Sequence, residues 1–140
     1  TMGYNTRAKI TEKNPYWIEK HRHYELKHFC MQYPIWKSYY NSLNGILCRP
    51  DEVAAFGKKR NISIPTERIA MLKKYYSDKM DLVEKTAEKT NKELAAYILK
   101  GVTEGMSYDV LKVRLNIPCC KDMYYEAYRK FFWLLNRERD

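Results

Sequence analysis

Apolar residues recur along this chain at intervals of three and four, the period of one face of an α-helix. Asn14-Pro15 supplies an N-cap and a proline for the first turn, so we expect a helix to begin there. Tyr33-Pro34 ends that helix and opens a second one, which we expect to stop at Gly45. The expected stripe of the first helix is Trp17, His21, Tyr24 and His28, with Leu26, Phe29 and Cys30 beside it. The expected stripe of the second helix is Ile35, Trp36, Tyr39, Tyr40 and Leu43.

The stretch from 46 to 65 changes character, because two Pro, one Gly and a basic run interrupt the pattern there. It reads as a linker that contains a short helix over 51–56. Thr66 then caps the longest expected helix, which ends near Lys89. Its apolar stripe is Ile69, Leu72, Tyr76, Met80 and Val83.

The last third of the chain predicts three helices joined by short turns. Asn91 caps the first, which runs to about Glu104 and ends at Gly105. Ser107 caps a short second helix over 108–115. Asn116 follows it and tolerates a positive φ, and the third helix begins near Lys121 or Asp122. The residues expected to face inward are Leu94, Ala95, Ile98 and Val102, then Leu111 and Leu115, then Met123, Ala127, Phe131 and Leu134.

These patterns predict an all-α protein with two parts. Residues 1–90 form a helical N-terminal region with the linker-like stretch inside it, and residues 91–140 form a three-helix unit. No strand-like alternation, internal repeat or low-complexity tract is present in the sequence.

Composition adds a core and a partner class to this picture. The chain has 140 residues, of which 45% are hydrophobic and 14% aromatic, enough to bury a core. Its 26 Lys and Arg exceed 17 Asp and Glu, giving a formal net charge of +9. A basic balance favours polyanionic partners such as nucleic acid, an anionic membrane or an acidic protein, and general solubility explains it equally well.

The turn region carries a resemblance to a known family. Residues 104–109 read EGMSYD, and an aliphatic series follows at Leu111, Leu115 and Ile117. This string resembles the helix-turn-helix of sigma-70 region 4 and of phage-encoded transcriptional regulators built on the same unit. The resemblance is confined to the chain beyond residue 90. It implies a DNA-binding unit whose last helix enters the major groove.

On that basis we expect the start of the last helix to contact DNA. Long basic and phenolic side chains suit phosphate oxygens and base edges. An equally available interpretation is that Tyr124 and Tyr128 are core residues and that the cations are merely solvated. The candidate DNA-binding residues are Lys112, Arg114, Lys121, Tyr124, Tyr125, Tyr128 and Arg129.

Other chemistry finds little support in the sequence. His21, His23, His28, Cys30 and Cys48 lack metal-ligand spacing, because neighbours two apart point to opposite helix faces. No phosphate loop, nucleophile elbow or carboxylate pair appears, so we expect neither an enzyme nor a cofactor or metal. Packing is the simpler role for Cys119-Cys120. No 18-residue apolar run or signal-peptide pattern occurs, so a cytoplasmic protein with no membrane association is expected.

The sequence therefore predicts a phage or prophage protein that binds duplex DNA and regulates transcription. Two alternatives stay open. One is a small terminase-type subunit that recognises a viral genome, and the other is a protein-binding inhibitor of a host nucleic-acid enzyme. Host RNA polymerase or another protein is an additional candidate partner, and homo-oligomerisation is a further expectation, since helix-turn-helix proteins so often act as dimers.

Overall fold

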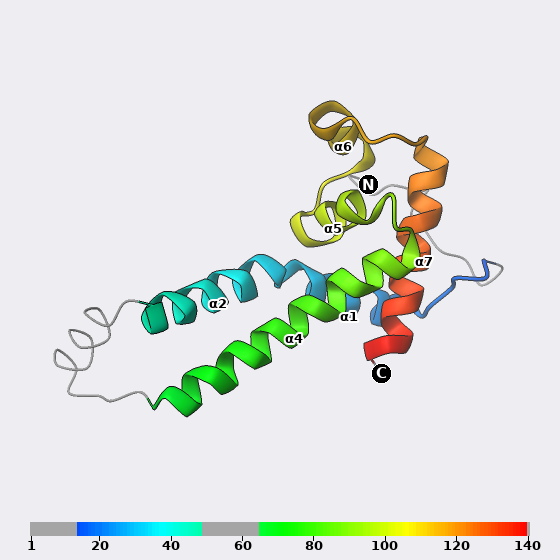
Figure 1. The fold of residues 1–140 in the computed structure, drawn as a ribbon. Helices are drawn as coiled ribbons and strands as arrows, with labels where there is room; N and C mark the ends of the chain where they lie inside the picture. Colours follow the sequence, from blue (N-terminus) through cyan, green and yellow to red (C-terminus); the bar gives the residue numbers. More distant parts are fainter. Residues whose placement is uncertain (1–13, 49–64, 140) are drawn as a thin grey trace. The chain divides into compact units, whose positions relative to one another are not determined.

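The computed structural model describes residues 14–48 and 65–139, and these residues are helical wherever they form regular structure (Figure 1). The helices are α1 (Lys20–Met31), α2 (Tyr33–Cys48), α4 (Thr66–Thr90), α5 (Ala95–Glu104), α6 (Tyr108–Leu115) and α7 (Lys121–Arg139). The all-α prediction is confirmed for the described residues. The predicted helix over 51–56 and most of the predicted linker lie outside them.

The chain divides into two units, which we name the core unit and the hairpin. The core unit combines the described residues up to Gln32 with those from Leu82 onward, and the hairpin runs from Tyr33 to Asp81. α1 thus belongs with α5, α6 and α7, although the sequence analysis placed it in a separate N-terminal region. Long helix α4 contributes its first part to the hairpin and its last part to the core unit.

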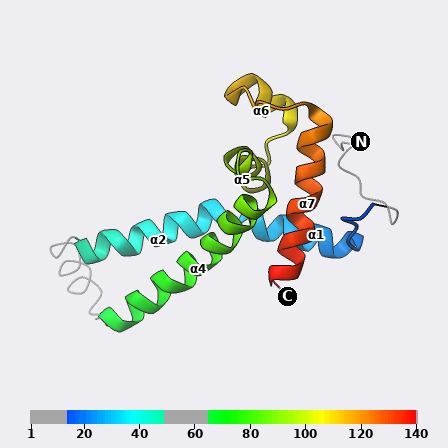
Figure 2. The same cartoon turned by 45° about the vertical axis from the view of Figure 1, so that its right-hand side comes forward.

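The core unit is built around α7, which contacts α1, α5 and α6 (Figure 2). One face of α7 is completely buried, because large aromatic and aliphatic side chains follow one another at helical spacing. Burying each of these side chains stabilises the fold by roughly 1.5–3 kcal/mol, because its apolar surface leaves water. The fully buried residues of this face are Tyr124, Phe131, Phe132 and Leu135.

Helix α1 begins later than the sequence predicted and buries a different face. The Asn14 side chain accepts a hydrogen bond from the Tyr16 amide within a turn. The N-cap of α1 is Glu19, whose carboxylate accepts from the amides of His21 and Arg22. The predicted start at Asn14-Pro15 is therefore wrong. The buried side chains here are Ile18, Leu26, Phe29 and Cys30. Trp17 and Tyr24 of the predicted stripe are exposed, as are His21 and His28.

Polar contacts at the end of α7 fix α1 against it. The Arg22 guanidinium donates to the Asn136 side-chain oxygen at 2.6 Å. Glu25 lies 3.5 Å from the Arg139 guanidinium, which also stacks 4.3 Å from the centre of the Phe29 ring. These groups are partly exposed, so they define the register between the helices more than they add stability.

Helix boundaries elsewhere follow the local signals with two exceptions. The Asn91 side chain accepts from the amides of Glu93 and Leu94 within a turn, but α5 begins at Ala95 with Leu94 as its N-cap, so the predicted start at Asn91 is wrong. α4 begins at Thr66, as expected. The predicted stop at Gly45 is wrong, because α2 continues to Cys48.

The hairpin consists of α2 beside the first part of α4 (Figure 1). Ile69 of the predicted α4 stripe is buried, while Leu72, Tyr76 and Met80 are half-buried. Cations lie over aromatic rings between the two helices, with Lys79 5.6 Å from the Trp36 ring and Lys73 close to Tyr40. Trp36 is the buried anchor on the α2 side, and Ile35 and Tyr39 of the predicted α2 stripe are half exposed.

The two inward leucines predicted for α6 allow a matched test of the core. Leu111 is completely buried, whereas Leu115 is 40% exposed, so the prediction for Leu115 is wrong. Replacing Leu111 with Ala should lower the free energy of unfolding by about 2–5 kcal/mol, because it leaves a cavity. Leu115→Ala should cost less than about 1 kcal/mol. Urea denaturation followed by circular dichroism measures both, and equal losses would contradict this assignment of the buried face.

A second prediction concerns pH and the half-buried His23. Its ring meets Phe132 edge-on at 4.9 Å, and burial together with the nearby Lys27 charge lowers its pKa to about 4 from 6.5. Between pH 6.5 and 4, His23 is therefore protonated in the unfolded chain and neutral in the folded chain. Stability should fall by on the order of 2 kcal/mol over this window and stay unaffected by His23 above it.

Thermal melts of the His23→Gln variant across the same pH range check this expectation. Its melting temperature should vary less between pH 6.5 and 4 than that of the wild type. His21→Gln is the control, since His21 is exposed on the same helix. A wild-type pH slope that survives in His23→Gln would show that other groups carry it.

Candidate nucleic-acid interface

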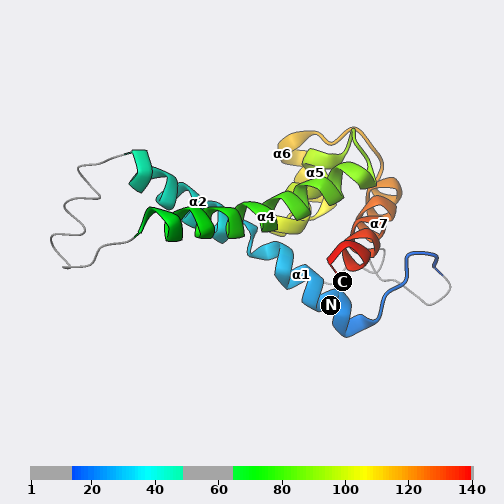
Figure 3. The ribbon, with the colours of Figure 1, turned by 60° about the horizontal axis from the view of Figure 1, so that its bottom comes forward.

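The candidate site is the turn-rich segment that joins α5, α6 and α7 in the core unit (Figure 3). Two residues in the left-handed region make its turns possible. Gly105 ends α5 with a φ of 70°, a conformation that favours glycine. Asn116 ends α6 with a φ of 53°, and its amide donates to the Lys112 carbonyl. The sequence predicted that Gly105 ends the first of these helices and that Asn116 follows the second, and both predictions are confirmed.

Helix α6 begins as predicted at Tyr108, with Ser107 as its N-cap. The Ser107 hydroxyl accepts from the Val110 amide at 3.3 Å, which satisfies one otherwise free donor of the first turn. Asp109 lies in the same turn, where a negative charge favours the helix dipole. The capping serine and the acidic first turn thus favour a helix start at Tyr108.

The turn between α6 and α7 is held by hydrogen bonds from side chains. The Tyr108 hydroxyl donates to the Cys119 carbonyl at 2.6 Å, and the Tyr108 amide donates to the Tyr125 hydroxyl at 3.3 Å. The Lys112 ammonium donates to the Ile117 carbonyl at 3.4 Å, a long and weak bond. Ile117 is fully buried beneath the turn. These contacts give the start of α7 a defined position relative to α6.

The predicted DNA-binding residues divide into three groups by exposure. Lys112 and Arg114 are exposed on α6, and Lys121 is half-buried at the first turn of α7, 3.7 Å from the Asp109 carboxylate. Tyr128 and Arg129 are half-buried, and the Arg129 side chain is 14% exposed and paired with Glu126 at 2.9 Å. Tyr124 and Tyr125 are buried.

The expectation that Tyr124 and Tyr125 lie on an exposed face is therefore wrong. Tyr124 is completely buried, and its ring lies 5.0 Å from Tyr125, 5.9 Å from Tyr108 and 6.2 Å from Tyr128, measured between ring centres. Burial raises the pKa of the Tyr124 phenol far above its usual range. These rings form part of the core, and they position the turn instead of presenting hydroxyls to solvent.

The corrected exposed side of the first turns of α7 carries other residues. Met123, expected in the core, is 56% exposed, and Asp122 and Glu126 are exposed beside it. A buried stripe that contains Met123 and one that contains Tyr124 differ by a rotation of only 100° about the axis of α7. Sequence offered one signal for the correct choice: the Tyr124 register, with Tyr128, Phe131 and Leu135, collects more aromatic volume.

The charge excess is not concentrated in this segment. Residues 82–140 carry 11 Lys and Arg against 9 Asp and Glu, an excess of two, whereas residues 1–81 carry 15 against 8, an excess of seven. An apolar group is exposed near the turn as well, with Val113 at 85% exposure and Leu115 and Met123 partly exposed. The segment is thus mixed in character and only mildly basic.

Metal and thiol chemistry gain nothing from the geometry. Among the described residues, no group of three or more His, Cys, Asp or Glu side chains is arranged to hold a metal ion. Cys30 is buried, which raises the pKa of its thiol. Burial and the adjacent Cys120 raise the pKa of Cys119, so its thiol is less reactive than an ordinary one. In the part of the chain that the structure describes, no helix is long and apolar enough to cross a bilayer.

Comparison with known proteins yields no relative. The chain matches no protein family, no curated protein and no solved structure.

Packing of α5 against α7 gives a testable pair of substitutions. Gly101 lies directly beneath the Tyr124 hydroxyl, and an added Cβ would collide with that oxygen. Among the described residues this hydroxyl has no hydrogen-bond partner. Gly101→Ala should therefore destabilise the protein by about 1–3 kcal/mol despite the better helix propensity of Ala. Tyr124→Phe alone should be neutral or stabilising, since it removes a buried unsatisfied group.

The double variant Gly101→Ala with Tyr124→Phe should recover most of the lost stability, because the colliding atom is gone. Denaturant midpoints of the four proteins give this coupling directly. Additive effects of the two substitutions would contradict the close approach of α5 and α7 at this point.

Proposed function

We propose that this protein binds duplex DNA through α6, the turn after it and the first turns of α7. The single observation that carries the proposal is the tied α6–α7 turn, with left-handed Asn116 at its start and an uncovered first turn of α7 at its end. A short helix followed by a tight turn and a longer, partly uncovered helix is the arrangement that helix-turn-helix proteins insert in a major groove.

The exposed cations fit the role of phosphate ligands. Lys112 and Arg114 lie on exposed positions of α6, and Lys121 begins α7. Phosphate contacts orient a protein on the duplex without reading its sequence. Because the local charge excess is small, we infer that these few contacts give modest non-specific affinity, with the remaining basic charge of the chain adding to it.

Base reading falls to different residues from those that the sequence suggested. Met123 offers an apolar contact of the kind that thymine methyl groups accept, and the carboxylate of Glu126 can accept from cytosine N4. Both are exposed on the first turns of α7. Because residues 104–117 resemble the helix-turn-helix of sigma-70 region 4 and of phage regulators, we propose that this DNA contact regulates transcription in a phage or prophage.

A protein partner is the second candidate function. The observation that favours it is the exposure of three apolar side chains in the helices on either side of this turn, Val113, Leu115 and Met123. Exposed apolar side chains favour contact with another protein over contact with solvent. Host RNA polymerase or an inhibited nucleic-acid enzyme would be partners of this type.

A salt titration with a matched control tests DNA binding. Fluorescence anisotropy with a random duplex should show binding that weakens with salt, because phosphate contacts release counterions. The Lys112→Ala, Arg114→Ala variant should bind more weakly and reduce the slope of log affinity against log salt by about 2. Lys85→Ala with Lys92→Ala removes the same charge at exposed positions outside the turn and should change the slope less.

Selection from a duplex library then tests base reading. Met123→Ala should lose about 1–3 kcal/mol of discrimination at one position of the selected site, whereas Tyr124→Phe should keep the wild-type preference. Equal effects of the two cation pairs, or no binding at low salt, would contradict the DNA proposal and favour the protein partner.

A further inference from the structure

Helix α4 carries a second stripe of side chains that it does not use to pack on α2. Arg68, Met71, Tyr75 and Asp78 are all exposed, and they follow one another at intervals of three, four and three. Met71 is 66% exposed and Tyr75 is 54% exposed. This spacing is that of the seam of a two-helix coiled coil, in which such positions face a second helix. The stripe lies wholly within the hairpin.

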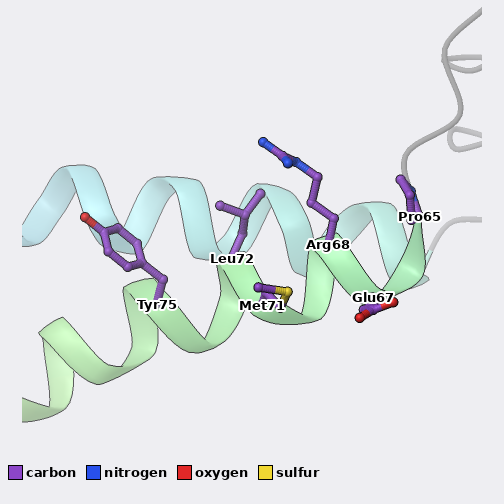
Figure 4. Close-up of a pocket in the computed structure, with 6 residues that line it drawn as sticks. All are labelled: Pro65, Glu67, Arg68, Met71, Leu72 and Tyr75. Atoms are coloured by element: carbon purple, nitrogen blue, oxygen red, sulfur yellow. The ribbon is translucent and has the colours of Figure 1, made fainter.

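The surface along the first part of this stripe is hollowed. A depression of about 540 Å³ is lined by six residues, and the lining is mainly apolar. Figure 4 shows Arg68, Met71, Leu72 and Tyr75 along α4. These four occupy positions i, i+3, i+4 and i+7, the four corners of the hole that receives one knob of a partner helix in knobs-into-holes packing. Pro65 and Glu67 complete the lining.

The stripe is complementary to itself in one direction only. When two copies of α4 run antiparallel about a two-fold axis near residue 73, each Arg68 faces an Asp78 and each Met71 faces a Tyr75. The Tyr75 ring of one copy then lies opposite the hole of the other, where a thioether–aromatic contact is favourable. A parallel pair would instead oppose Arg68 with Arg68 and Asp78 with Asp78, which like-charge repulsion disfavours.

We propose that the hairpin is a homodimerisation element, in which the Arg68–Met71–Tyr75–Asp78 stripe of one chain packs antiparallel on the same stripe of a second copy. The contact spans only about 15 Å of helix at 1.5 Å per residue. An interface this short is at the weak end of specific association. We therefore expect a reversible dimer with a Kd on the order of 10–100 μM. The inference stands independently of DNA binding, because it concerns other residues.

Sedimentation equilibrium of the full chain, without DNA, measures this association. The wild type should show a concentration-dependent monomer–dimer equilibrium. Arg68→Glu places two carboxylates opposite each other twice in the dimer, and Asp78→Arg places two guanidinium groups opposite each other twice. Each single variant should weaken dimerisation about tenfold or more. Lys37→Glu makes the same change of charge at an exposed position of α2, off the stripe, and should leave the Kd unchanged.

The double variant Arg68→Glu with Asp78→Arg restores opposite charges across the antiparallel pair, so it should return the Kd to within a few-fold of the wild type. Circular dichroism confirms that each variant folds, since all the changed positions are exposed. A wild type that stays monomeric at millimolar concentration overturns the proposal. A dimer that is indifferent to Arg68→Glu, or a double variant that is no better than the single ones, overturns it as well.

Discussion

The wide apolar face of α7 constrains the rest of the core unit. A helix with two neighbouring phenylalanines and a buried tyrosine on one side cannot be covered by one partner, so α1, α5 and α6 all lie against it. Each covering helix accommodates α7 in its own way. α5 provides a glycine beneath the Tyr124 hydroxyl, α6 is linked to α7 by the Tyr108 amide, which donates to the Tyr125 hydroxyl, and α1 contributes Leu26 and Phe29. The same packing limits how much of α7 stays available to a ligand.

The sequence predicted turns and helix starts well in the last third of the chain because those signals are local. A serine hydroxyl that caps α6 and a left-handed Gly105 or Asn116 act through the few residues around them. At the other end of the chain, Asn14-Pro15 carried the same kind of signal but formed only a turn. Glu19, a less usual capping residue, satisfied the first amides of α1 instead, where Ile18 is buried. There tertiary packing prevailed over local preference.

The side of each helix that becomes buried was harder to predict, and tyrosine is the physical reason. A tyrosine has a large apolar ring and a polar hydroxyl, so it suits either a core or a nucleic-acid surface. The sequence predicted Tyr124 and Tyr125 on the surface and Met123 in the core, whereas in the structure the two tyrosines are buried and Met123 is exposed. The prediction for Leu115 was wrong as well, because this residue is 40% exposed although it follows the fully buried Leu111 by one helical turn. The helices and turns of the candidate site lie where the sequence predicted them, whereas the prediction of which α7 residues face outward was partly wrong.

The excess of positive charge is shared by the two units, because the core unit carries 17 Lys and Arg against 12 Asp and Glu and the hairpin carries 9 against 5. A net charge of +9 suggests a strongly basic DNA-binding surface, but the segment from Leu82 onward has an excess of only two. A recognition surface with little excess charge depends on shape and on base contacts, because few counterions are released when it binds. Doubling such a surface by association of two chains raises its effective affinity without new phosphate contacts. The proposed weak dimer and the proposed DNA contact would thus act together, because two linked recognition surfaces gain affinity while each single contact stays reversible.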